Sequence, residues 1–179
     1  MREFIYFSKD ARTTGNFTNL MEAGRLDIAC HTIIASLFLS HSIRHDVKIH
    51  LIFNGPPDAP KHIEIFYHPE LPISKKDVAG LLKRALYKYR KGMKTEPFPG
   101  GTIEKKSLPA LLEELEAAGK TTYILDRKGE DIRAISTDAL QNAVFLIGDE
   151  EGIPKQEMRR IKHLGKLSFL GNNFSIKLR

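Results

Sequence analysis

An acidic loop between two glycines is the stretch of this sequence best suited to hold a small ligand. The apolar run 144–147 is followed by Gly148, Asp149 and, after two further acidic residues, Gly152. Such a run is typical of a strand that is covered on both faces, as in α/β sheets. The glycines remove side chains on either side of the acids, so the backbone could approach a ligand there. The glycine order matches neither a dinucleotide turn nor a phosphate loop, so spacing alone leaves an ordinary strand-to-helix connection equally open.

A second polar pair, Arg25 and Asp27, lies near the entrance of an expected helix. Apolar residues recur at helical spacing over residues 21–40, and they form a face broad enough to be buried. Residues two positions apart do not share a helix face, yet both side chains lie where they could reach a neighbouring cleft. The residues leave open the alternative of an acid favoured by the helix dipole beside a solvated arginine.

The densest basic surface is expected on a helix over residues 75–93, capped by Ser74. Its polar side interleaves lysines and arginines with two tyrosines. Contact with RNA phosphates is one interpretation, and a solvated helix face is the other. The residues that would contact RNA are Lys83, Arg84 and Lys88.

Composition bounds the class of protein. A chain of 179 residues with 41% hydrophobic content can bury one substantial core, which predicts a single α/β or α+β domain over residues 1–179. The net charge of +6 favours an acidic partner such as nucleic acid. One cysteine, Cys30, excludes an internal disulfide framework and is compatible with a reducing cytoplasm. The start of the chain does not resemble a signal peptide, and the apolar stretch 28–39 is too short to span a bilayer.

Strand and helix patterns predict the elements that would position these residues. The alternation of strands and helices in the second half indicates a sheet with parallel strands. Residues 95–101, rich in proline and glycine, predict a loop. Strands are expected at residues 2–8, 47–53, 63–66, 121–125, 144–147 and 166–170, and further helices at 107–118 and 154–163.

No metal site is expected from the sequence. His41 and His45 stand four residues apart, but no third ligand is close in sequence and the helix is ending there. Cys30 lies on an apolar helix with no basic neighbour, so a buried inert thiol is expected rather than a nucleophile.

Several separated motifs resemble a known enzyme family. Residues 24–28, 38–51, 145–149 and 152–154 look like the corresponding segments of the archaeal-type tRNA pseudouridine N1-methyltransferases of the SPOUT class. Members of this family act on the T-loop pseudouridine at position 54. The resemblance extends from the first expected strand to about Gly171.

This resemblance implies a SPOUT α/β fold with a mostly parallel sheet, a C-terminal trefoil knot and a homodimer. Residues 1–120 would face the RNA, and residues 121–179 would form the knot and bind the cofactor, S-adenosylmethionine. Backbone groups in a tight, largely apolar slot suit an adenine edge. By matching position, the cofactor would be held by Leu125, Asp126, Gly148, Asp149, Gly152, Leu170 and Gly171.

The same resemblance implies methyl transfer to N1 of pseudouridine. That nitrogen becomes a good nucleophile only as its proton leaves, and a positioned carboxylate is a plausible acceptor. Asp27 is the expected base, with Arg25 and Arg44 holding the uracil oxygens or a nearby phosphate. The target base must leave its stack for this reaction.

The end of the sequence departs from the family pattern. Members continue past the equivalent of Gly171 into a further helix and strand, whereas only residues 172–179 follow here. An altered knot and cofactor pocket are therefore expected. The alternatives that remain are a catalytically impaired RNA-binding protein of the same fold, an rRNA pseudouridine N1-methyltransferase, and a protein-interaction domain without an RNA partner.

Overall fold

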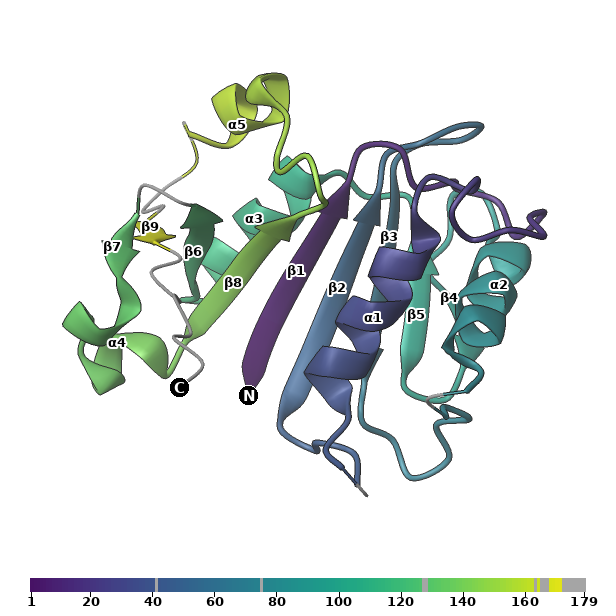
Figure 1. The fold of residues 1–179 in the computed structure, drawn as a ribbon, viewed down its shortest axis with the longest axis horizontal. Coiled ribbons are helices and arrows are strands. Elements are labelled where there is room, and N and C mark those ends of the chain that lie inside the picture. Colours follow the sequence, from purple (N-terminus) through teal and green to yellow (C-terminus); the bar gives the residue numbers. More distant parts are fainter. Residues whose placement is uncertain (41, 75, 127–128, 163, 165–167, 172–179) are drawn as a thin grey trace, which may run out of the picture.

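The computed structural model describes residues 1–40, 42–74, 76–126, 129–162, 164 and 168–171 (Figure 1). A 9-stranded sheet with the order β4-β5-β3-β2-β1-β8-β6-β9-β7 forms the centre of the molecule. The pairings from β2 through β1, β8, β6 and β9 to β7 are parallel, and those among β2, β3, β5 and β4 are antiparallel. The strands are β1 (Arg2–Ser8), β2 (Val47–Phe53), β3 (Lys61–Phe66), β4 (Thr95–Phe98), β5 (Gly101–Glu104), β6 (Thr121–Asp126), β7 (Glu130–Asp131), β8 (Ala143–Gly148) and β9 (Ser168–Gly171).

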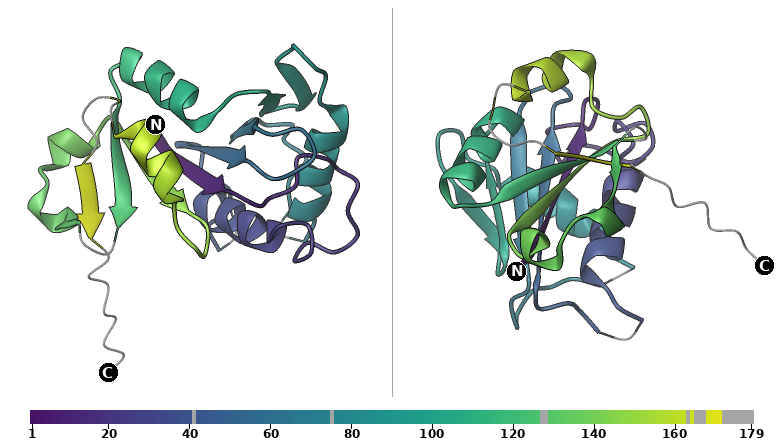
Figure 2. Two further views of the ribbon diagram at one scale, coloured as in Figure 1. Left: turned by 90° about the horizontal axis from the view of Figure 1, so that it is seen from above. Right: turned by 90° about the vertical axis from the view of Figure 1, so that its left-hand side faces the viewer.

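Helices cover both faces of this sheet (Figures 1 and 2). On one face, α1 and α2 pack on β1, β2, β3 and β5 around a core that includes Ile33, Leu51 and Leu82. On the other face, α3 and α5 pack over β1 and β8 around Ile5, Leu112 and Val144. The helices are α1 (Leu26–Leu37), α2 (Val78–Lys88), α3 (Leu108–Ala117), α4 (Thr137–Leu140) and α5 (Lys155–Ile161), with a 3-10 turn at Ile132–Ala134.

The apolar runs become the central strands because both of their faces are covered. In β1, Ile5 and Phe7 face α3, while Tyr6 faces α1, and all three are at most 1% exposed. Alternate side chains of a strand point to opposite faces, so a continuous apolar run suits a three-layer fold. The parallel sheet predicted for the second half of the chain is confirmed.

The structure corrects some expected boundaries. The composition of residues 95–101 predicts a loop, but β4 and β5 make an antiparallel hairpin there, with a register shift between Thr95 and Phe98. The irregularity tolerates Pro97 at the edge of the sheet. Helix α2 begins at Val78 rather than at residue 75, and its N-cap is Asp77, not Ser74.

The two expected halves of the chain share one sheet. The N-terminal strand β1 pairs with β2 on one side and with β8 on the other, so β1 joins the early and late strands. The predicted changes to the knot concern residues 172–179, which lie outside the described residues. Among the described residues, no helix has the length and apolar character needed to cross a membrane.

Candidate functional site

Three neighbouring parallel strands bring the expected cofactor residues to one edge of the sheet. In the pairing of β6 with β9, Leu125 lies opposite Leu170 and Asp126 opposite Gly171. On the other side of β6, β8 ends at Gly148. The chain leaves all three strands at the same edge. Ligands of open α/β sheets bind at this carboxyl edge of the strands.

The loop after β8 is a tight turn tied down by Asp149. The backbone N–H of Gly152 donates to the carbonyl of Asp149 at 2.9 Å. The two carboxylate oxygens of Asp149 accept from the backbone N–H groups of Glu151 at 3.1 Å and Lys9 at 3.2 Å. A Cβ added to Gly148 would lie 2.4 Å from the carbonyl carbon of Gly152. Gly148 and Gly152 therefore approach each other closely, and Asp149 has a structural role in this turn.

Arg25 and Asp27 contact each other at the entrance of α1. Arg25 is the N-cap residue and has a left-handed backbone, with φ 58° and ψ 40°. Its Nε and Nη2 donate to the two carboxylate oxygens of Asp27, each at 3.0 Å. Residues two positions apart do not share a helix face. These two side chains nevertheless meet, because Arg25 precedes the helix and does not have helical geometry.

This pair also joins α1 to the loop after β8. Nη1 of Arg25 donates to Glu150 at 3.3 Å. The hydrogen bonds from Arg25 lower the pKa of the Asp27 carboxyl group. A carboxylate with a lowered pKa is a weaker proton acceptor, so the Arg25 ion pair makes Asp27 less suited to the proton-acceptor role expected of it.

A buried hydroxyl lies near the same acids. Tyr6 is 1% exposed, and its hydroxyl has no hydrogen-bond partner among the described residues. Burial raises the pKa of Tyr6, and the negative charges of Asp149, Glu150 and Asp27 raise it further, while the nearby Ser8 hydroxyl lowers it. A buried donor without a partner is costly, and a bound ligand could satisfy it.

These features fit S-adenosylmethionine. The glycine-bordered loop offers backbone groups, the Tyr6 hydroxyl is an unpaired donor within the described part of the chain, and Asp27, Asp149 and Glu150 concentrate negative charge near it. Negative charge favours a cationic sulfonium.

Arg44, expected to hold the uracil oxygens or a nearby phosphate, contacts the other end of α1 rather than this cluster. Its Nη1 donates to the backbone carbonyls of Ala35 at 2.9 Å, Ser36 at 3.0 Å and Phe38 at 3.4 Å. These carbonyls belong to the C-terminal end of α1, whereas Asp27 lies in its first turn. A helix of 12 residues is about 18 Å long. Arg44 is therefore a cap for the end of α1.

The expected RNA-binding residues on α2 differ in their surroundings. Lys83 donates to the carbonyl of Phe17 at 2.9 Å and lies 5.4 Å from the centre of the Phe17 ring. Arg84 and Lys88 are exposed. A Cβ added to Gly15 would lie 2.8 Å from the carbonyl oxygen of Lys83, so the loop between β1 and α1 packs closely on α2. Lys83 therefore holds that loop, while Arg84 and Lys88 present their charges to solvent.

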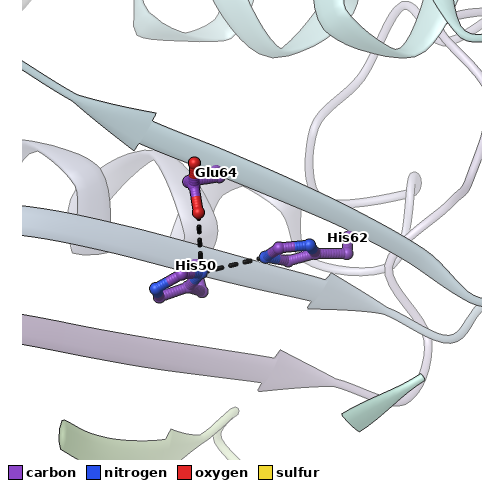
Figure 3. A group of neighbouring side chains, drawn as sticks. All are labelled: His50, His62 and Glu64. Carbon is purple, nitrogen blue, oxygen red and sulfur yellow. Dashed lines mark hydrogen bonds and ion pairs between the residues drawn. The ribbon is translucent and has the colours of Figure 1, made fainter. Parts of the chain in front are cut away.

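Sequence reasoning missed a buried polar group on β2 and β3. His50, His62 and Glu64 point toward one another from neighbouring strands (Figure 3). The sequence did contain a signal for this group, because polar residues alternate with apolar ones in both strands. These polar residues are at positions 48, 50, 62 and 64. Of the pair considered for a metal, His41 lies outside the described residues, and the His45 ring stacks on Tyr67 with 3.6 Å between ring centres.

Comparison with known proteins finds relatives that carry the same name. A protein of Methanococcoides burtonii named tRNA (pseudouridine(54)-N(1))-methyltransferase is 37% identical over 181 aligned positions, covering 96% of this chain and 87% of the relative. A protein of the same name from Methanopyrus kandleri is 32% identical and covers 96% of this chain and 84% of the relative. The fold resembles that of Archaeoglobus fulgidus Nep1 bound to S-adenosylhomocysteine, with a TM-score of 0.59, 13% identity and coverage of 95% of this chain and 88% of that one.

A family model matches most of the chain. Residues 1–170 match the family described as "Putative SAM-dependent RNA methyltransferase". This range contains the Arg25–Asp27 pair, the ends of β6 and β8, and all of β9 except Gly171. The chain belongs to this family of SAM-dependent RNA methyltransferases.

Proposed function

We propose that this protein methylates N1 of pseudouridine at position 54, in the T-loop of tRNA, with S-adenosylmethionine as the donor. The observation that carries the proposal is the Arg25–Asp27 ion pair, which contacts the loop after β8 through Glu150. The names of the two archaeal relatives support the substrate and the position. When bound, S-adenosylmethionine supplies a methyl group activated by a positively charged sulfur.

The edge formed by β6, β8 and β9 would hold this donor. Backbone groups near Leu125, Gly148 and Leu170 would contact it at the strand ends, together with Asp126, Asp149, Gly152 and Gly171. The Tyr6 hydroxyl, which lacks a hydrogen-bond partner among the described residues, is available to donate a hydrogen bond to this cofactor. Asp149 keeps the loop closed by accepting two backbone hydrogen bonds.

Asp27 would take the proton from N1 of the flipped base. N1 would lose its proton to a carboxylate oxygen of Asp27 as it takes the methyl group, while the sulfur–methyl bond of the donor would break and leave its electron pair on S-adenosylhomocysteine. If a uracil oxygen accepts hydrogen bonds from Arg25, the Arg25–Asp27 pair weakens and the pKa of Asp27 rises toward its ordinary value. Binding of the base would thus make Asp27 a better acceptor, which couples substrate orientation to catalysis.

The decisive experiment is methylation of matched tRNA transcripts. One transcript carries pseudouridine at position 54 and the other carries uridine there, and an rRNA fragment containing pseudouridine is a third substrate. We expect N1-methylpseudouridine only in the first, detected by mass spectrometry of nucleosides. Cofactor binding without methylation of any transcript would instead support a catalytically impaired RNA-binding protein, for which the lowered pKa of Asp27 is the favouring observation.

The exposed charges of α2 are proposed to contact tRNA phosphates. We expect replacement of Arg84 and Lys88 by glutamine to weaken tRNA binding and to reduce the slope of log affinity against log salt by about 1 to 2. Lys83→Gln is the matched control, because the ammonium group of Lys83 already donates a hydrogen bond to the Phe17 carbonyl. An unchanged salt slope in the double variant, measured by fluorescence anisotropy, would remove α2 from the RNA interface.

We also propose a trefoil knot, a homodimer and a cytoplasmic location. An apolar pocket of about 490 Å³ between α1 and the edges of β1, β2 and β8 supports the dimer, because a second copy could cover it. It is lined in part by Phe4, Ile28, Val47 and Ile147. Light scattering of the purified protein should give twice the mass of one chain, and a monomer at micromolar concentration would contradict the dimer.

A further inference from the structure

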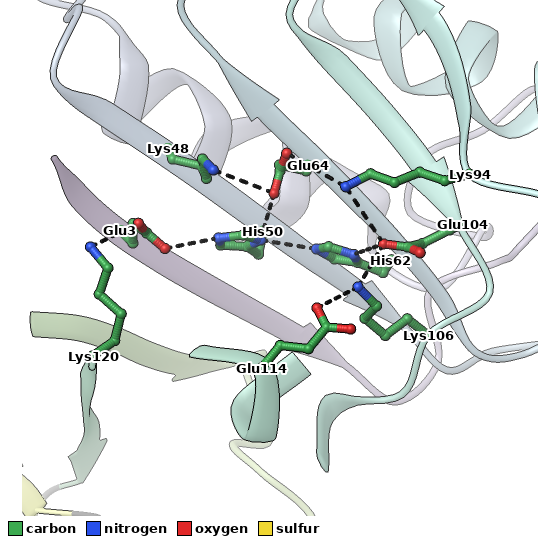
Figure 4. A network of polar contacts seen from close by, with 10 residues as sticks. All are labelled: Glu3, Lys48, His50, His62, Glu64, Lys94, Glu104, Lys106, Glu114 and Lys120. Atoms are coloured by element: carbon green, nitrogen blue, oxygen red, sulfur yellow. Dashed lines mark hydrogen bonds and ion pairs between the residues drawn. The ribbon is translucent and has the colours of Figure 1, made fainter. Parts of the chain in front are cut away.

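A row of buried polar side chains crosses β1, β2, β3 and β5 on the sheet face opposite α1 and α2 (Figure 4). At its centre, His50 and His62 are 2% and 1% exposed. Their neighbours Ile49, Ile63 and Ile65 point to the other face, into the core beneath α1 and α2. The row therefore lies on the other side of the sheet from the helix that carries Asp27.

Each histidine has a ring nitrogen within hydrogen-bond distance of a carboxylate. Nε2 of His50 lies 3.3 Å from Glu3, and Nδ1 of His62 lies 3.2 Å from Glu104. Carboxylates at these distances accept hydrogen bonds, so the arrangement favours the tautomers in which these ring nitrogens carry the protons. A neutral histidine has only one ring proton, and its other nitrogen then presents a lone pair.

The two remaining ring nitrogens face each other. Nδ1 of His50 and Nε2 of His62 are 2.9 Å apart. If both histidines are neutral, two lone pairs point into the same gap and repel each other. With these tautomers, an additional proton or a metal ion between the two nitrogens removes the repulsion.

Glu64 supplies a third ligand atom at this gap. One of its carboxylate oxygens is 3.7 Å from Nδ1 of His50, and the three ligand atoms lie within 4.8 Å of one another. Tetrahedral zinc with bonds of about 2.1 Å holds its ligand atoms about 3.4 Å apart. The His50–His62 contact would open by about 0.5 Å and the Glu64 contact would shorten slightly. Two imidazoles and one carboxylate leave a fourth position for water.

The outer carboxylates have the arrangement that supports a metal-binding histidine. A histidine that binds a metal usually donates its other N–H to a carboxylate, which fixes the ring and its tautomer. Glu3 and Glu104 occupy these places for His50 and His62. They are held in turn by Lys120 at 3.2 Å and Lys106 at 2.8 Å.

Two lysines limit the strength of such a site. Nζ of Lys48 lies 3.6 Å from Glu64, and Nζ of Lys94 lies 4.0 Å from it. Both would have to move away from Glu64 when a cation binds. Lys94 is 49% exposed, so its side chain can swing into solvent, and Glu64 itself is 14% exposed and offers a route of entry.

We propose that His50, His62 and Glu64 bind a divalent transition metal ion of the zinc class, through Nδ1, Nε2 and a carboxylate oxygen respectively. The ion replaces the shared proton and links β2 to β3, away from the methyl-transfer site. Imidazole ligands favour zinc, cobalt, nickel and copper over magnesium and calcium.

The test uses the tag-free wild-type protein and cobalt chloride as the probe. We expect one equivalent of Co²⁺ to give a visible d–d absorption typical of four-coordinate cobalt, which one equivalent of zinc chloride abolishes. Absence of this band, together with no rise in melting temperature in zinc chloride, would mean that only a proton occupies the gap and would overturn the proposal.

Substitutions at the proposed ligands and at a distant histidine test where the metal ion binds. Glu64→Gln, whose side chain is partly exposed, should fold and lower the affinity for Co²⁺ at least 10-fold, and Glu104→Gln should lower it about 10- to 100-fold. His31→Gln changes an exposed histidine on α1 and should bind Co²⁺ as the wild type does. Wild-type affinity in Glu64→Gln, or lost binding in His31→Gln, would contradict the proposed ligands.

Discussion

At the scale of single residues, the backbone conformation of Arg25 brings its guanidinium against the carboxylate of Asp27, and this contact lowers the pKa of Asp27. A left-handed φ of 58° is uncommon for a residue with a side chain, and it turns the guanidinium back onto the first turn of α1. Strained backbone persists where the surrounding structure determines it, and such residues are concentrated at functional sites. Here Gly24, with φ 75°, passes so close to the carbonyl oxygen of Asp10 that no side chain would fit.

Asp27→Asn should bind S-adenosylmethionine normally and methylate about 10²- to 10⁴-fold more slowly, because a general base is removed while the shape is kept. Calorimetry and a single-turnover methylation assay separate the two effects. Glu150→Gln is the control, since it alters a single 3.3 Å contact of Arg25 and leaves both bonds to Asp27. Full activity of Asp27→Asn would remove Asp27 from the mechanism.

Gly148→Ala should disrupt the loop after β8 and weaken cofactor binding at least 10-fold. The new methyl group would lie 2.4 Å from the backbone carbon of Gly152, and backbone must move to accommodate it. Gly92→Ala tests the alternative that any such change is harmful, because its Cβ would meet nothing within 4 Å. We expect that control to cost only about 1 to 2 kcal/mol from its positive φ. Equal cofactor affinity in Gly148→Ala and the wild type would contradict the tight turn.

At the scale of elements, α1 connects the proposed catalytic pair to the opposite end of the molecule. Its first turn carries Asp27, its buried face packs on β2, and its last carbonyls bind Arg44. Cations at a helix C-terminus are favourable, because they satisfy free carbonyls and interact with the helix dipole. From these contacts we expect Arg44 to stabilise the end of α1.

Arg44→Ala should therefore destabilise the protein by about 1 kcal/mol, the usual contribution of such a cap at a partly exposed site. Urea unfolding measures this change. The single-turnover rate of methylation should stay close to the wild-type rate at a temperature where both proteins are folded. A large loss of methylation rate with unchanged stability would restore Arg44 to the catalytic machinery, for example through the partner protomer of a dimer.

At the scale of the whole molecule, charged side chains link the start of β3 to neighbouring elements. Lys61 is fully buried, and its ammonium donates to the carbonyl and carboxylate of Asp58, both at 2.6 Å. It also lies 3.8 Å from the centre of the Tyr89 ring, which follows α2. Lys105, after β5, pairs with the same Asp58 carboxylate. One carboxylate thus joins the loop before β3 to the segment that follows β5, the strand beside β3.

This cluster predicts how stability falls in acid. Hydrogen bonds from Lys105 and Lys61 lower the pKa of Asp58 from 3.8 to about 2. A lowered folded pKa means that the stabilisation is complete above the ordinary value and is lost as pH falls from about 4 to about 2. Asp58→Asn should be less stable than the wild type at pH 7 and should lose less stability across that window. Urea unfolding at several pH values measures it, with Glu113→Gln on the exposed face of α3 as the control. Parallel pH profiles for Asp58→Asn and the wild type would contradict the predicted role.

The sequence alone determined the main elements and the family. Apolar runs such as residues 144–147 specify buried strands, because a short strand covered on both faces buries an apolar side chain at every position. Ser107 was recognisable as the start of α3 because its hydroxyl caps the backbone N–H of Ala110 locally. Motifs spread over residues 24–154 were sufficient to indicate the methyltransferase family, which the match over residues 1–170 confirmed.

Only the tertiary structure decided which distant side chains meet. The His50–His62 contact depends on the antiparallel register of β2 and β3, and a shift of one residue would turn one ring into the opposite core. The contact of Arg25 with Glu150 spans 125 residues of sequence. The different surroundings of Arg44, Lys83 and Arg84 likewise follow from packing, because local sequence specifies a charged side chain but not the carbonyl or solvent that it faces.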